Sequence, residues 1–80
     1  MSAHIVVFIT MGSIDEGRKI ARTLVEEQLA ACVNILPAIE SVYRWEGQVQ
    51  SDREVLLIVK TAAVIIEQLA ARVRQLHSYE

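Results

Sequence analysis

Cysteine, proline and glycine are scarce in this 80-residue chain, and the shortage of cysteine is the most restrictive. A single cysteine, Cys32, excludes an internal disulfide framework and is compatible with a reducing compartment. One proline and three glycines, with 52% hydrophobic and 22% charged residues, indicate a globular chain. Eighty residues have room for one domain, so we expect a single domain over residues 1–80.

Signals for membranes, secretion and nucleic acids are also missing. No run approaches the roughly 20 apolar residues that span a bilayer, and the first residues lack the basic region of a secretory signal. The net charge of −2 provides no basic footprint for nucleic acid or an acidic membrane. We therefore expect a cytoplasmic protein with neither a nucleic-acid nor a membrane partner.

Motifs of catalysis and of dedicated metal sites are absent as well. The chain has no G-x-S-x-G, no phosphate-binding loop, and no C-x-x-C, H-x-x-x-H or H-E-x-x-H spacing. Cys32 lies at a predicted buried corner, where a thiol is inert, and its histidine partners are distant in the sequence. These observations predict that the protein is not an enzyme.

The first half of the chain has the pattern of a strand followed by a helix. Residues 5–10 form an apolar run rich in β-branched residues, typical of a strand covered on both faces. Ser13 and Glu16 form a capping box, and apolar residues then recur at helical spacing. We predict a helix over residues 14–31 whose ordinary solvent-facing surface carries Arg18, Lys19 and Arg22.

A long hairpin follows the helix. A second strand begins near residues 32–36, Pro37 is expected at a bulge or an edge, and the strand resumes over 39–45. A turn at residues 46–48 leads to a third strand over 49–60. The outer half of this hairpin is polar and the inner half is apolar, so we expect the outer half to protrude.

Tyr43 and Trp45 share one face of the hairpin, and we expect them to pack across the hairpin or in an interface. The hairpin leads into a second predicted helix. Thr61 is placed to cap the helix, whose apolar stripe is Ile65, Ile66, Leu69, Val73 and Leu76.

The element order β-α-β-β-α predicts an α+β fold, namely a ferredoxin-like split-βαβ sandwich whose final strand is missing from this chain. Without that strand, the first strand presents an unpaired edge, which proteins usually cover. Residues beyond Glu80 or another chain would cover it, and the first option is the simpler. The large apolar fraction also favours oligomerisation, because a chain this short buries only about 60% of its unfolded surface.

Four segments carry more specific patterns. They are residues 29–35 (LAACVNI), 41–47 (SVYRWEG), 54–61 (EVLLIVKT) and 76–80 (LHSYE). In this order they resemble the CutA family of divalent-cation tolerance proteins, with Ser78 standing where the family has proline. The resemblance implies a ferredoxin-like fold assembled as a homotrimer, in which long hairpins extend neighbouring sheets. Because the family continues with a further strand and a short helix, we expect this CutA-like domain to be C-terminally incomplete.

The same resemblance implies divalent metal ions as partners, copper among them, with Cys32 and His77 as ligands. A thiolate and an imidazole suit copper or zinc, and Glu80 adds a carboxylate. We expect no cofactor to be required for folding. Ile9 and Leu76 stand where some family members have a cysteine and a second histidine.

Each candidate ligand also has a structural interpretation. Cys32 fits a small buried residue that closes the helix-to-strand corner, and the residues by themselves favour this role over ligation. His77 fits a helix C-terminus, where the macrodipole favours a cation. His4 lies near the chain terminus and is most simply a solvated residue.

Three functions are consistent with these features. The first is a trimeric protein of divalent-metal tolerance that binds copper or a similar cation. The second is a small-molecule sensor similar to the PII signalling proteins, which share the trimeric ferredoxin-like architecture. The third is a trimeric scaffold or anchoring protein. A fold by itself does not distinguish these functions.

Overall fold

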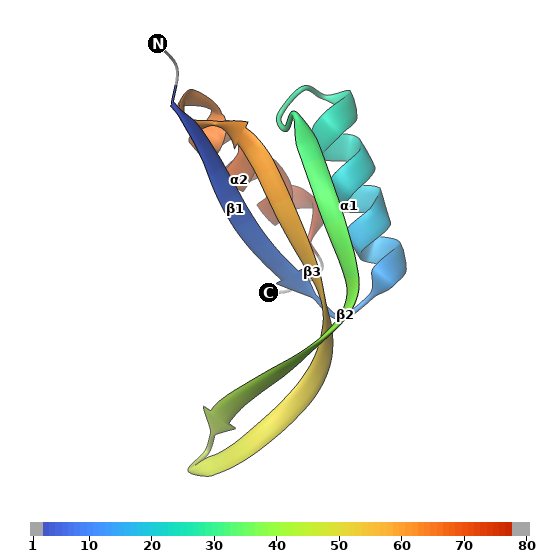
Figure 1. The fold of residues 1–80 in the computed structure, drawn as a ribbon, viewed down its shortest axis with the longest axis vertical. Coiled ribbons are helices and arrows are strands. Elements are labelled where there is room, and N and C mark those ends of the chain that lie inside the picture. The colour runs from blue at the N-terminus through green and yellow to red at the C-terminus, as the bar shows by residue number, and fades with distance from the viewer. Residues whose placement is uncertain (1–2, 78–80) are drawn as a thin grey trace.

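The computed structural model describes residues 3–77 and contains three strands and two α-helices (Figure 1). The elements in chain order are β1 (His4–Met11), α1 (Ile14–Glu26), β2 (Cys32–Trp45), β3 (Gln48–Ala62), a 3₁₀ turn (Ala63–Ile65) and α2 (Ile66–Leu76). This order confirms the predicted α+β class and the β-α-β-β-α arrangement.

The three strands form one antiparallel sheet in the order β1-β3-β2. On β3, Lys60 pairs with Val6 of β1 and with Cys32 of β2, and Leu56 pairs with Thr10 of β1. Among residues 3–77, β1 therefore has a strand neighbour on one side only. This is the unpaired edge that the element order predicts.

Both helices cover the same face of the sheet, and the core lies between these two layers (Figure 1). Alternation along the strands directs every second side chain toward the helices. Gly17 lets α1 approach the sheet closely, because a Cβ there would lie 3.1 Å from the Met11 sulfur. The largest fully buried side chains are Met11, Ile20, Leu24, Leu57, Val59 and Leu69.

Among residues 3–77 of this single chain nothing covers the other face of the sheet, so the prediction that residues 5–10 are covered on both faces is wrong for the chain by itself. Burial alternates along β1, and Val6 and Phe8 on the open face are 53% and 65% exposed. A continuous apolar run does not reveal how many layers cover a strand. Here both helices take one side, and the apolar residues that point the other way remain exposed in this chain.

Helix α1 begins as predicted and ends earlier than predicted. The Ser13 hydroxyl accepts a hydrogen bond from the Glu16 N–H at 3.3 Å, which confirms the cap. The helix stops at Glu26 rather than at residue 31. Gln28 has a positive φ of 61°, and the chain then turns so that the N–H of Leu29 bonds back to the Leu24 carbonyl at 2.8 Å.

The hairpin of β2 and β3 extends beyond the helices as a twisted ribbon (Figure 1). The pairing register shifts between Leu36 and Ile39, which confirms the predicted irregularity at Pro37. Glu46 and Gly47 make a two-residue turn with φ of 51° and 79°. Positive φ at both positions is the hairpin turn whose twist matches the strands.

Thr61 does not cap the second helix, contrary to the sequence-based expectation. It belongs to β3 and is buried, and its hydroxyl donates a hydrogen bond to the Leu29 carbonyl at 2.8 Å. A 3₁₀ turn separates it from α2, and no side chain of residues 3–77 caps the start of that helix. Thr61 instead holds the loop after α1 against the end of β3.

Candidate functional site

Cys32 is the first residue of β2 and lies on the open face of the sheet. Its thiol is free and exposed, so the predicted burial of Cys32 is wrong. Val33, the next residue, points toward the helices, and alternation directs Cys32 to the opposite side. The corner is closed instead by Ala30 and by the Thr61 hydrogen bond. An exposed thiol is accessible to a soft metal ion.

His77 follows the last residue of α2 and is half-buried against β1. Its N–H donates to the Val73 carbonyl at 2.7 Å, which confirms the expected helix C-terminal position. Its ring Nε2 lies 2.9 Å from the Thr10 carbonyl oxygen. Because a carbonyl only accepts, Nε2 carries the proton in this contact. Coordination of a metal through Nε2 would require this hydrogen bond to break.

The structure does not bring Cys32 and His77 together within one chain. Cys32 shares a row of the sheet with Lys60, whereas the Thr10 carbonyl that holds His77 lies in the row of Leu56. Four residues along β3 separate the rows by about 13 Å. Donor atoms on one copper or zinc ion lie within about 4 Å of each other. No group of three metal-ligating side chains occurs within residues 3–77, and Glu80 lies outside the described residues.

Polar side chains form cross-strand hydrogen bonds along the protruding hairpin. The Tyr43 hydroxyl donates to the Asp52 carboxylate, which confirms that Tyr43 packs across the hairpin. This hydrogen bond raises the pKa of Tyr43 above its ordinary value, with smaller contributions from desolvation and the nearby negative charges. Trp45, on the same face, remains exposed.

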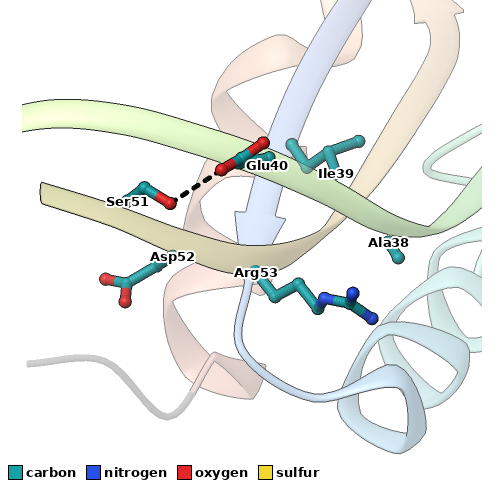
Figure 2. Close-up of a pocket in the computed structure, with 6 residues that line it drawn as sticks. All are labelled: Ala38, Ile39, Glu40, Ser51, Asp52 and Arg53. Atoms are coloured by element: carbon teal, nitrogen blue, oxygen red, sulfur yellow. Dashed lines mark hydrogen bonds between the residues drawn. The ribbon is translucent and has the colours of Figure 1, made fainter.

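The hollow on the hairpin has a volume of about 460 Å³ and is shown in Figure 2. Glu40 accepts a hydrogen bond from Ser51 at 2.8 Å on one side of the ribbon, while Asp52 points away from that pair. Arg53 extends toward the start of α1, where it also lines a smaller hollow with Gly12. These charged groups diverge, so the hollow does not present a nucleophile beside a base.

A second groove, of about 450 Å³, lies between α1 and β2, and the sequence-based prediction missed it. It is lined by Ala21, Val25, Glu26, Val33 and Ile35, with Arg18 and Arg22, which the sequence assigned to ordinary helix surface. The available signal was the spacing of four between Arg18 and Arg22 and again between Ala21 and Val25. That spacing places a basic row beside an apolar row.

Comparisons with known proteins agree with the fold and its motifs. A sequence model of the CutA1 family, described as CutA1 divalent ion tolerance protein, matches residues 5–80. The chloroplastic CutA protein of Arabidopsis thaliana is 53% identical over 76 residues, which cover 95% of this chain and 42% of that protein. The divalent-cation tolerance protein CutA of Thermus thermophilus is 53% identical over 74 residues, covering 92% and 72%.

Solved structures show the same architecture. The divalent cation tolerance protein of Thermus thermophilus superposes with a TM-score of 0.89 and 51% identity over 96% of this chain and 75% of that one. A structure titled PII-like protein CutA, from Nostoc, superposes with a TM-score of 0.81 and 39% identity, covering 100% and 72%. The chain thus spans less than half of the Arabidopsis protein and about three quarters of the bacterial ones. It belongs to the CutA1 family of divalent ion tolerance proteins.

Proposed function

We propose that this chain acts in divalent-cation tolerance as a non-catalytic homotrimer that binds copper or a similar cation. The observation that carries the proposal is the match of the CutA1 family over residues 5–80. The exposed thiol of Cys32 supports metal binding, because thiolates are strong ligands for copper and zinc. Cytoplasmic location stays a prediction, since a relative is named as chloroplastic.

The open sheet face supports assembly. Val6 and Phe8 are more than half exposed and stand beside the half-buried Ile58 on β3. An apolar patch of this kind on a small domain is typical of a surface that another protein chain covers. Burial of this face in a homotrimer would also bring the Cys32 residues of different copies near one another.

Titration calorimetry on metal-free protein tests the metal role. We expect saturable Cu(II) or Zn(II) binding that weakens in Cys32→Ser and in His77→Ala. The matched control is His4→Ala, which removes an exposed histidine from the start of β1 and should leave binding unchanged. If injections of metal into the unmodified protein give no more heat than injections into buffer, the metal proposal fails for this chain.

A PII-like sensing role is the second candidate, and the superposition on the Nostoc structure titled PII-like favours it. The tight two-residue turn of the hairpin weighs against it, because a sensor that contacts a target through a flexible loop needs a longer connection. A thermal-shift screen with nucleotides is the test. Stabilisation by a nucleotide in the absence of metal would favour sensing over metal binding, whereas a scaffold would respond to neither.

A further inference from the structure

The groove between α1 and β2 combines an apolar floor with a basic rim. Val33 and Ile35 of β2 point toward α1 and are only partly buried. Val25, which faces the same groove from the helix, is 44% exposed. Ligand pockets generally combine a mostly apolar lining with a few polar or charged groups. The groove volume of about 450 Å³ lies within the usual range for such pockets.

The two cations on the rim have no partner among the described residues. Arg18 and Arg22 lie one helical turn apart, and neither makes a hydrogen bond or an ion pair with residues 3–77. Arg72 shows the contrast. Its guanidinium donates to both Glu27 carboxylate oxygens at 2.8 Å, so this arginine is already paired with a carboxylate. The rim guanidinium groups are therefore available for an anion.

The groove also has a direction. Because β1 and β2 are parallel to each other, α1 must run back antiparallel to both. Arg18 therefore lies toward the Ile35 end of the groove, and Glu26 lies toward the Val33 end. An anionic group is attracted by Arg18 at the Ile35 end and repelled by Glu26 at the Val33 end. An apolar body attached to it would lie along Val25 and Val33.

We propose that this groove binds a small amphipathic monoanion, a carboxylate joined to a short aliphatic or aryl body. The carboxylate pairs with Arg18 and Arg22, and the body covers Val25, Val33 and Ile35. The site is separate from Cys32, which lies on the opposite face of the sheet. The inference does not depend on metal binding, and each can fail without the other.

The test is a titration of the 80-residue chain, in its native assembly, with octanoate, followed by amide chemical shifts. We expect saturable shifts confined to residues 18–26 and 33–35. Octanol, which has the same chain length without the charge, should shift these amides at least about fivefold more weakly, as expected for loss of two exposed ion pairs. Metal is left out, so the proposed metal site does not contribute.

Matched variants separate the charge from the apolar floor. Arg18→Gln with Arg22→Gln should weaken octanoate about fivefold to tenfold, whereas Arg44→Gln with Arg74→Gln, which removes the same charge elsewhere, should not. Val25→Glu should abolish binding. Val64→Glu, at a residue that is 84% exposed and outside the groove, should leave it intact.

Several results would overturn the proposal. Equal affinity for octanol would show that the arginines do not select an anion. Shifts centred on Val6 and Phe8 would place the ligand on the open sheet face instead. Saturable binding only of an extended acidic peptide, with shifts along the whole edge of β2, would indicate strand addition rather than a small-ligand site.

Discussion

The hydrogen bond between Tyr43 and Asp52 makes a residue-level prediction about ionisation. The carboxylate accepts from the neutral phenol and opposes the phenolate, so the pKa of Tyr43 is raised. Asp52→Asn removes the charge and should lower this pKa toward its ordinary value of 10.0. Absorbance titration of tyrosinate in a Tyr79→Phe background, where Tyr43 is the only tyrosine, measures the change.

The sign for stability follows from the raised pKa. The folded state holds the Tyr43 proton more tightly than the unfolded state, so the bond contributes stability below pH 10 that is lost as the pH rises through the folded-state pKa. Ser51→Ala, which leaves Asp52 charged, is the control. An unchanged tyrosine titration in Asp52→Asn would contradict the assignment.

Thr61 gives a second prediction at this scale. Thr61→Val keeps the shape and removes the hydroxyl that donates to Leu29. We expect a loss of about 1–2 kcal/mol in the free energy of unfolding, because the partly buried Leu29 carbonyl loses the hydrogen bond that it accepts from the buried Thr61. Thr23→Val is the matched control, since the Thr23 hydroxyl bonds to the Lys19 carbonyl within α1. Urea denaturation should show a larger loss for Thr61 than for Thr23.

At the scale of elements, the approach of α1 to the sheet is set by Gly17. A Cβ at Gly17 would lie 3.1 Å from the Met11 sulfur and 3.2 Å from a Val55 methyl. Both neighbours are buried, so neither can move away freely. Gly17→Ala should therefore destabilise the protein by about 1–2 kcal/mol, even though alanine favours helices.

Thermal unfolding measures this change. A smaller neighbour should compensate, so Val55→Ala combined with Gly17→Ala should cost less than the sum of the two single changes. Additive losses would mean that the crowding between α1 and β3 does not determine the effect. A gain in stability from Gly17→Ala alone would show that helix propensity outweighs packing at this position.

At the scale of the whole molecule, the open sheet face is expected to hold the proposed trimer together. Phe8→Lys places a charge at a side chain that is 65% exposed in the single chain. The fold of one chain should tolerate it, but an interface that buries Phe8 should not. We expect native mass measurement to change from trimer to monomer, with the circular dichroism of the strands and helices retained.

Val64→Lys provides the comparison, because Val64 is even more exposed and lies in the 3₁₀ turn, away from the sheet face. Its mass should stay that of the unmodified protein. An unchanged mass for Phe8→Lys would place any interface elsewhere, and an unmodified protein that is monomeric at all concentrations would remove the trimer from the proposal.

Local patterns in the sequence were enough to predict the order of the elements, the start of α1 and the irregularity at Pro37, but not the end of α1. Ser13 caps α1 because its hydroxyl accepts a hydrogen bond from the N–H three residues later in the chain. Pro37 interrupts the strand pairing because it lacks an N–H. The four segments that resemble CutA are also sufficient to predict the family, which the family match over residues 5–80 confirms. All these signals depend on near neighbours in the chain.

Only the tertiary structure decided which surfaces and partners those elements share. Burial of Cys32 and coverage of residues 5–10 depended on which side of the sheet the helices take, and an apolar run is the same for either side. The Thr61 hydroxyl donates to a carbonyl 32 residues away in the chain, and Arg18 lines one groove together with the apolar Ile35. Contacts between distant segments are set by packing, so the sequence determined the elements and the family, while the packing determined the open face and the groove.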